Sequence, residues 1–304
     1  MSPEPRGSVP PRPSSPVLHE VVEQIGKAEA LDPPAKRIGK AVRSALGPGK
    51  LKDAVSGTWL GHALHPLLTD IPIGTWTSAI VLDLTGGRST ADASRRLIGT
   101  GILAALPTVA TGYSDWADSE VGDESVRRIG IIHAAANATA LTLFTASWAA
   151  RRRGSHAGGV TLALAGAGAL GVGGHLGGHL SYVNGIGVNQ TTFQEGPTEW
   201  TPTLAADDLA EGGTACADAG GMPVLLARHN GTVYALANRC SHRGGPLDEG
   251  DLEDGCVICP WHDSKFRLED GSVARGPATS PQPSFETRVQ EGRIEVRLAG
   301  DSGT

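Results

Sequence analysis

The sequence has few charged residues, few cysteines and few aromatic residues, and each shortage narrows what the protein can be. Charged residues make up 19% of the 304 positions, below the usual share of about a quarter. The net charge of −6 gives no basic surface for binding nucleic acid. Four cysteines do not make a secreted disulfide framework. Residues 1–16 are rich in proline and serine and lack the apolar core of a signal peptide, so we expect a disordered tail there.

Motifs of several enzyme classes are also missing. We find no catalytic triad, no phosphate-binding loop, no paired-carboxylate cleft and no internal repeat. A GxGxxG pattern runs from Gly166 to Gly171, but it lies within an apolar segment and does not follow a strand. A dinucleotide site needs the strand and the turn before its helix, so this pattern does not indicate one.

Long apolar segments occupy the middle of the chain. Each is close to the roughly 17–25 residues that cross the hydrocarbon of a bilayer. They predict an all-α four-helix transmembrane bundle over residues 57–183, with the lipid bilayer around it. A soluble helical bundle is the alternative, because the segments are rich in small residues and because Asp70 and Asp83 interrupt them. The four segments are residues 65–84, 97–113, 129–150 and 160–182.

Residues 17–56 precede the bundle and show two amphipathic helical patterns, broken at Pro33-Pro34. The second carries basic residues on its polar side, so it either lies on a membrane surface or packs on its own protein. The next stretch reads Gly61-His-Ala-Leu-His-Pro-Leu-Leu-Thr-Asp-Ile-Pro-Ile-Gly74. It resembles a family of small bacterial four-helix membrane proteins, a resemblance that implies the fold but no activity.

Four histidines lie in or beside the apolar segments, namely His65, His133, His175 and His179. Antiparallel spans would put the start of the first, the start of the third and the end of the fourth on one side of the bilayer, and these histidines occupy those places. Both termini would share that side. Imidazoles from facing helices can bind a b-type haem or a second metal, or line a quinone site. Hydrogen bonding across the bundle is the structural alternative.

After a linker at residues 184–198, the pattern changes to short apolar runs bounded by turn residues. Asn230-Gly231 separates two such runs, which is a strong signal for a β-hairpin. Residues 199–299 are therefore predicted to form an all-β antiparallel sandwich, and the whole chain is multidomain.

Two short motifs in this last domain carry metal-binding chemistry. Cys240-Ser-His242 and Cys259-Pro-Trp-His262 each offer one thiolate and one imidazole. A Rieske [2Fe–2S] cluster needs two cysteines on one iron and two histidines on the other. The competing interpretation is a zinc site, because Cys256 and Cys259 also have zinc-like spacing. Cys256 and Cys216 are otherwise expected to be small buried apolar residues.

With their flanks, Cys240-Ser-His-Arg-Gly-Gly-Pro-Leu and Cys259-Pro-Trp-His-Asp-Ser-Lys-Phe, these motifs resemble the Rieske iron–sulfur family over residues 199–298. High-potential members carry an extra cysteine pair, whose places look to be Gly245 and Trp261 here. The resemblance is therefore closer to the ferredoxin-like members, which implies the lower part of the Rieske potential range. We expect Gly245, Pro260 and Ser264 around the cluster, with Ser264 able to donate a hydrogen bond to a cluster sulfur.

Together these features predict a membrane-bound electron-transfer protein, an oxidoreductase component without a complete catalytic site of its own. The expected partners are a redox protein or a quinone, and a haem at the membrane domain is the second expected cofactor. The alternatives are a membrane-tethered Rieske ferredoxin whose helical domain is only an anchor, and a redox sensor. We expect a multi-pass protein of the cell membrane with both termini on the cytoplasmic side.

Overall fold

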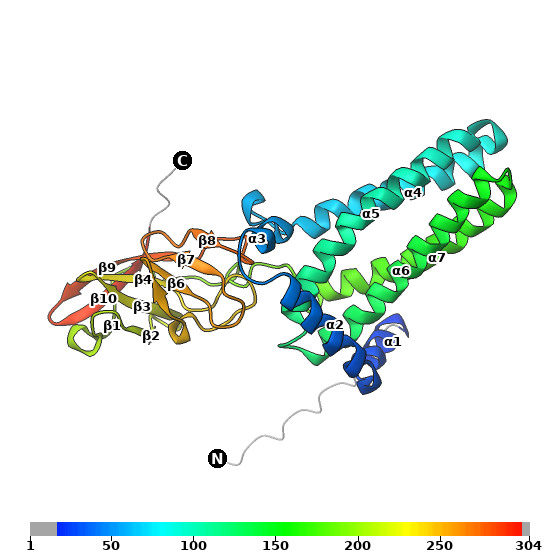
Figure 1. Ribbon diagram of the computed structural model, residues 1–304. Helices are drawn as coiled ribbons and strands as arrows, with labels where there is room; N and C mark the ends of the chain where they lie inside the picture. The colour runs from blue at the N-terminus through cyan, green and yellow to red at the C-terminus, as the bar shows by residue number, and fades with distance from the viewer. Residues whose placement is uncertain (1–16, 300–304) are drawn as a thin grey trace, which may run out of the picture.

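The computed structural model describes residues 17–299, so the tail expected at residues 1–16 lies outside the described residues. A helical domain and a β-domain lie end to end, as Figure 1 shows. The α-helices are α1 (Val17–Gly26), α2 (Asp32–Ala45), α3 (Lys50–Ser56), α4 (Leu64–Gly86), α5 (Ala91–Ser119), α6 (Glu124–Arg152) and α7 (His156–Tyr182). Short 3-10 helices are η1 (Glu29–Leu31), η2 (Thr58–Leu60), η3 (Gly87–Thr90), η4 (Ala206–Asp208) and η5 (Leu247–Glu249).

Helices α4 to α7 form the expected four-helix bundle as two hairpins, α4–α5 and α6–α7, while α1 to α3 pack at the end nearest the β-domain (Figure 1). Within the described residues, three helical stretches are long and apolar enough to cross a membrane: Leu64–Ser119, Glu124–Arg152 and His156–Tyr182. The first of these stretches contains both α4 and α5, which η3 joins.

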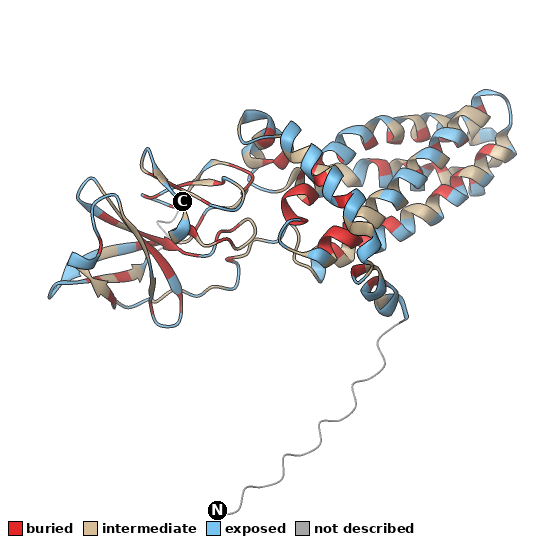
Figure 2. Cartoon of the chain, turned by 60° about the horizontal axis from the view of Figure 1, so that its bottom comes forward, coloured by how far each residue is buried: buried red, intermediate tan, exposed pale blue. Residues whose placement is uncertain are grey.

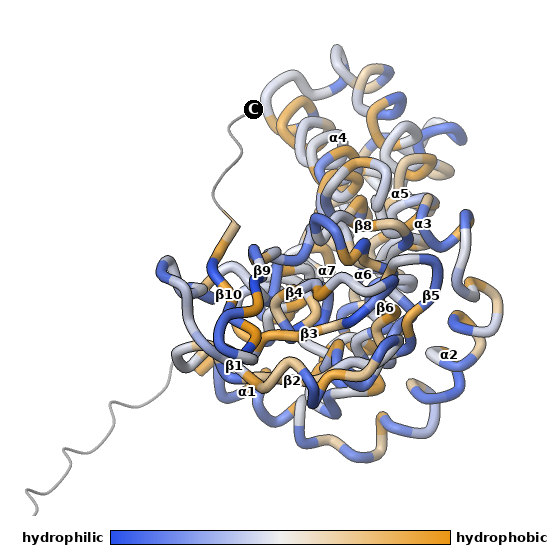
Figure 3. The backbone as a smooth tube through the Cα atoms, turned by 90° about the vertical axis from the view of Figure 1, so that its left-hand side faces the viewer, coloured by the Kyte–Doolittle hydropathy of each residue, from blue (hydrophilic) through white to orange (hydrophobic). Residues whose placement is uncertain are grey.

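The outer surface of the bundle is apolar. Leu84, Leu103 and Leu106 are each more than half exposed, as is Val172 on α7. Figure 2 shows the long helices largely intermediate or exposed, with buried residues most concentrated where the short helices pack. Figure 3 shows hydrophobic positions recurring along α4 and α5. An exposed apolar surface of this extent is typical of a membrane domain, because in water it would favour aggregation.

Helices α4 and α6 meet across the centre of the bundle through two pairs of side chains. Trp76 on α4 stacks on Phe144 of α6, with ring centroids 4.2 Å apart and planes 13° from parallel. Farther from the β-domain, both carboxylate oxygens of Asp83 accept hydrogen bonds from Arg151, at 2.9 and 2.5 Å. Because both side chains are buried, this ion pair fixes the register of the two helices.

The two hairpins repeat one packing pattern. Asp83 and Arg151 are 68 residues apart, and the same spacing separates Trp76 from Phe144. The same spacing also separates His65 from His133. Each of the four rings fills the space beside a glycine of the following helix. These pairs are His65 with Gly112, Trp76 with Gly101, His133 with Gly177, and Phe144 with Gly166. This finding corrects the expectation of no internal repeat, which arose because the paired positions hold different residues.

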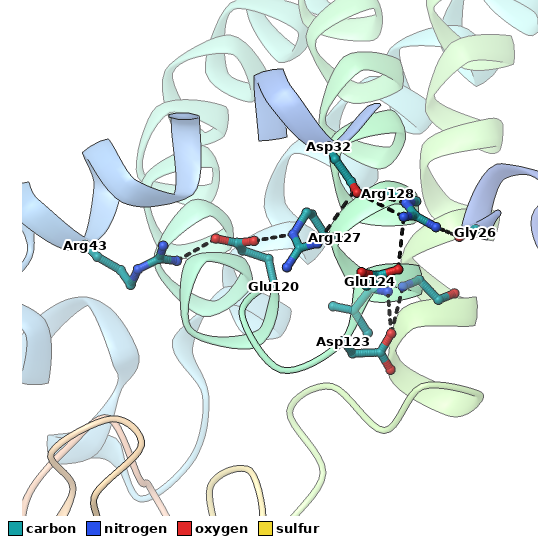
Figure 4. Close-up of polar contacts among 10 residues, drawn as sticks. Gly26, Asp32, Arg43, Glu120, Asp123, Glu124, Arg127 and Arg128 are labelled. Carbon is teal, nitrogen blue, oxygen red and sulfur yellow. Dashed lines mark hydrogen bonds and ion pairs between the residues drawn. The ribbon is translucent and has the colours of Figure 1, made fainter. Parts of the chain in front are cut away.

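A network of buried ion pairs fixes α1 and α2 to the turn between α5 and α6 (Figure 4). Glu120 is 2% exposed and accepts from Arg43 of α2 and from Arg127 of α6, both at 2.7 Å. Arg128 forms a two-pronged contact with Asp32, with both hydrogen bonds at 2.9 Å. The basic amphipathic helix therefore packs on its own protein through this network.

The β-domain is the expected antiparallel sandwich. One sheet has the strand order β1-β10-β9-β4-β3-β2 and the other β5-β6-β7-β8. Asn230 and Gly231, both with positive φ, form the predicted hairpin turn between β3 and β4. The strands are β1 (Thr201–Ala205), β2 (Thr214–Asp218), β3 (Pro223–His229), β4 (Thr232–Ala237), β5 (Leu252–Glu253), β6 (Cys256–Ile258), β7 (Lys265–Arg267), β8 (Val273–Arg275), β9 (Ser284–Gln290) and β10 (Arg293–Leu298).

Candidate metal centre

The first metal-binding loop follows β4 and closes on itself. The amide of Cys240 donates to the carbonyl of Gly245 at 2.9 Å, and the amide of Gly244 donates back to the carbonyl of Cys240 at 2.8 Å. Gly244 has a φ of +79°, a conformation that favours glycine. This tight turn explains the glycine at position 244 and holds the His242 side chain at the tip of the loop.

The second loop follows β6 and has the same design. The amide of Cys259 donates to the carbonyl of Ser264 at 2.8 Å, and the amide of Asp263 donates to the carbonyl of Cys259 at 3.1 Å. Asp263 has a φ of +61°, and aspartate is among the non-glycine residues that adopt this conformation most readily. The turn places His262 at the tip of its loop.

The structure brings together the four predicted ligands. Cys240 and Cys259 are each 1% exposed, and their thiols hydrogen-bond each other. That bond raises the pKa of Cys240 and lowers the pKa of Cys259 to about 7, so Cys259 is the first of the pair to become a metal-binding thiolate. The rings of His242 and His262 lie edge to face with centroids 5.1 Å apart. Burial lowers the pKa of both histidines, so both are in the neutral form that ligates metals.

These side chains fit a cluster of two irons. The Nδ1 atom of His242 is buried and has no hydrogen-bond partner, as expected for a ligand atom that is reserved for a metal. Among residues 17–299, no three side chains of His, Cys, Asp or Glu converge on one point suited to a single metal ion. A pair of thiols beside a pair of imidazoles is instead the arrangement that a Rieske cluster divides between its two irons.

The other two cysteines do not join the site. Cys256 is buried as expected, and its sulfur lies 3.7 Å from the carbonyl oxygen of Asp254. The zinc interpretation needs Cys256 beside Cys259, but the thiol of Cys259 instead hydrogen-bonds the thiol of Cys240. Cys216 is exposed, which corrects the expectation that it is buried. It lies at the edge strand β2, where one face of the strand meets solvent.

The three residues expected around the cluster differ from one another in burial and in their contacts. Ser264 is fully buried, and its hydroxyl oxygen accepts from the amide of Ala278 at 3.0 Å, which leaves the hydroxyl hydrogen to donate elsewhere. A Cβ at Gly245 would lie 3.0 Å from both the sulfur of Cys259 and the ring of Trp261. The glycine is therefore needed for close packing beside the thiolate. Pro260 is exposed beside its loop.

Sequence reasoning missed Gln282, which holds the first loop in place. Its side-chain oxygen accepts from the amide of Ser241 at 2.9 Å. Its side-chain nitrogen donates to the carbonyls of Ala237 and Arg239, both at 3.0 Å. The only signal was indirect, because Gln282 lies between Pro281 and Pro283, and closely spaced prolines indicate a fixed loop. Sequence reasoning also missed Asp118 and Lys52, which reach the site from the helical domain.

The four membrane-domain histidines lie at the end of the bundle nearest the β-domain, but they do not converge as one group. His65 donates from Nδ1 to the carbonyl of Thr108 at 3.0 Å, and His133 donates from Nδ1 to the carbonyl of Gly173 at 2.8 Å. His175 is exposed on the outside of α7. His179 packs against His19 of α1, with ring centroids 5.8 Å apart. Only His65 and His133 thus occupy matching places in the two hairpins.

A β-sandwich that carries Cys-His pairs on two turns is the architecture of an iron–sulfur electron carrier, and comparisons with known proteins agree. Residues 199–286 match the Rieske [2Fe-2S] domain family, and residues 61–190 match the family described as predicted membrane protein DUF2231. The chain belongs to the Rieske family through its β-domain, fused to a membrane-protein domain of the second family. Its cofactor is accordingly a [2Fe–2S] cluster.

The relatives of the β-domain include small ferredoxins. The ferredoxin subunit of anthranilate 1,2-dioxygenase from Burkholderia cepacia is 34% identical over 100 residues, covering 33% of this chain and 93% of the relative. The ferredoxin component of the alkene monooxygenase system of Xanthobacter autotrophicus is 36% identical, and the match covers 32% of this chain and 80% of the relative. The solved structure of the ferredoxin of carbazole 1,9a-dioxygenase from Nocardioides aromaticivorans IC177 is 26% identical. The match covers 33% of this chain and 98% of that chain, with a TM-score of 0.32.

Proposed function

We propose that this chain is a membrane-bound electron-transfer protein, in which a Rieske cluster held by Cys240, His242, Cys259 and His262 exchanges single electrons with a haem or quinone at the helical domain. When bound, the cluster supplies a one-electron carrier. The observation that supports the proposal best is that both histidines of the site meet Asp118 of the helical domain.

The protein residues do three things for such a carrier. The buried thiols and their loop hydrogen bonds exclude water from the sulfur side. Gln282 and the turn at Gly244 hold the first loop in a single conformation, so that little rearrangement accompanies a change of charge. Ser264 keeps a hydroxyl hydrogen available for a cluster sulfur, which would raise the reduction potential.

Of the four membrane-domain histidines, His65 and His133 best support the haem. Each donates its Nδ1 hydrogen to a backbone carbonyl of the next helix, which leaves Nε2 as the basic nitrogen. In His133 this nitrogen lies 3.3 Å from the side-chain nitrogen of Asn137, which would have to turn away for a haem to bind. A hydrogen bond of this kind orients histidine ligands in metal sites. One residue comes from α4 and the other from α6, the helices that meet across the bundle. His175 is exposed and His179 packs against His19 of α1, so we narrow the candidate haem ligands to His65 and His133.

The optical spectrum of the full chain, purified from membranes of cells supplied with haem precursor, tests this assignment. The wild-type protein should show haem absorption, which His65→Ala or His133→Ala should abolish while leaving the cluster signal unchanged. His175→Ala is the matched control, because this side chain is exposed on the same domain. A wild-type protein that contains the cluster but no haem would refute the haem and favour the tethered ferredoxin, with the bundle as an anchor.

The membrane location needs its own test. Cell fractionation should find the chain in the membrane fraction, and it should resist extraction by alkaline carbonate. Fusion of a reporter enzyme to either terminus should give the same result at both ends, active on the cytoplasmic side. Release of the protein by carbonate would contradict insertion of α4 to α7, and opposite results at the two ends would contradict an even number of spans.

A further inference from the structure

The histidine side of the candidate metal centre faces a carboxylate of the helical domain. Asp118 lies in the last turn of α5, and its Oδ2 atom is 3.9 Å from Nε2 of His242. The ring of His262 lies against the backbone of the same aspartate. Both candidate histidine ligands therefore meet one residue, which lies more than a hundred positions earlier in the chain.

Asp118 is held in place by a second buried charge. Its Oδ2 atom is 2.7 Å from the ammonium nitrogen of Lys52 in α3, and the two side chains are 8% and 7% exposed. Lys52 also donates to the hydroxyl of Ser114 at 2.7 Å. The ion pair offsets part of the cost of burying the two charges. Its residues come from α3 and α5, which meet beside the first metal-binding loop.

Further hydrogen bonds fix the two domains around this contact. The amide of Gly276 donates to the carboxylate of Asp53 in α3 at 2.8 Å. A Cβ at Gly276 would lie 2.2 Å from the hydroxyl of Thr58, so the close approach of these two segments requires a glycine. On the other side of the loop, Arg243 donates to the carbonyl of Gly185 at 3.2 Å. The segment at Gly276 is therefore bound to the helical domain, and the first metal-binding loop is bound to the linker that follows α7.

Little free space remains between the domains beside His242. The cavity there has a volume of about 50 Å³ and is lined by residues of both domains, including Ser56, Asp115 and Arg243. A cavity of this size holds water. While the domains are in contact, the helical domain covers the edge of His242 that faces Asp118.

We propose that the end of the helical domain, formed by α3, η2 and the last turn of α5, is a built-in docking partner for the histidine side of the cluster. Asp118 is the positioning residue of this surface. Separate redox proteins then do not reach the histidine edge in the docked state. This proposal rests on the proposed function, since it takes the cluster to be bound by the four ligands named above.

Asp118→Asn and Lys52→Gln test the proposal because they change charge in opposite directions beside the same histidines. Reduction adds negative charge to the cluster, and a nearby carboxylate opposes it. In the full chain, D118N should therefore raise the cluster's reduction potential and K52Q should lower it. Asp208→Asn, an exposed carboxylate of the β-domain, is the control and should leave the potential unchanged. The potential is read from the cluster's electron paramagnetic resonance signal during a redox titration.

A disulfide trap tests the docking independently of these charges. The Thr58 hydroxyl lies 3.4 Å from the carbonyl of Ala278, across the domain contact. In the Thr58→Cys/Ala278→Cys variant, dissolved oxygen should oxidise the two thiols to a disulfide in most molecules, as seen by peptide mass mapping. Unchanged potentials in D118N and K52Q together with no cross-link would overturn the proposal. Wild-type protein lacking iron and acid-labile sulfide would instead refute the proposed function.

Discussion

Replacing Gln282 with leucine tests how the first metal-binding loop is held. The side chain is 2% exposed and makes three hydrogen bonds, to Ser241, Ala237 and Arg239. Leucine has a similar size but satisfies none of these three backbone groups. At about 1 kcal/mol for each bond, the variant should lose about 3 kcal/mol of unfolding free energy. For a domain of about 100 residues, this loss corresponds to a fall in Tm of roughly 12–24 °C.

The assay is thermal unfolding of the full chain, followed by the visible circular dichroism of the bound cluster. Gln290→Leu is the matched control, because Gln290 is exposed on β9, and it should change stability by no more than about 0.5 kcal/mol. If Q282L melted within about 4 °C of the wild type, equivalent to less than one hydrogen bond, the loop would be held by other contacts and our reading of Gln282 would be wrong.

Three further predictions concern other parts of the molecule. Asp83→Ala leaves Arg151 buried without its partner and should lower the free energy of unfolding in detergent by about 3–5 kcal/mol. The Asp83→Leu/Arg151→Met double variant should keep a stability near that of the wild type. Equal losses in the two variants would argue against a stabilising ion pair. Gly245→Val introduces side-chain atoms against the cluster thiolate and should lower the iron content; unchanged iron would contradict the tight packing. The hydrogen bond from Arg128 lowers the pKa of Asp32, so the stability it contributes should be complete above the usual carboxyl pKa and lost as the pH falls through the lowered value. Asp32→Asn should remove that part of the pH dependence, and an unaltered profile would refute the assignment.

Much of the fold could be predicted because it depends on local pattern. Apolar segments of uniform length predicted the bundle, and Asn230-Gly231 predicted a hairpin that the structure confirms. The repeat within the bundle was missed because it is a repeat of packing and not of identity. An aspartate in one hairpin corresponds to an arginine in the other, and Trp76 corresponds to Phe144.

In the candidate site too, local patterns could be predicted from the sequence and tertiary contacts could not. The four ligands could be predicted because each loop carries its own thiolate and imidazole at a diagnostic spacing. The orientation of α7 about its own axis could not be predicted, since tertiary packing decides which face of a helix is buried. This packing leaves His175 exposed. Asp118 could not be predicted either. Its contact with His242 depends on how two domains meet, and no local pattern encodes this.

The most direct test of the central claim is the metal and sulfide content of the full chain, purified without oxygen, together with its electron paramagnetic resonance spectrum after reduction. We predict about two irons and two acid-labile sulfides per chain, and a signal of the Rieske type. Both should be lost in Cys259→Ser but retained in Cys256→Ser, which removes the zinc-like neighbour. Zinc without iron or sulfide, or equal loss in the two variants, would contradict the account.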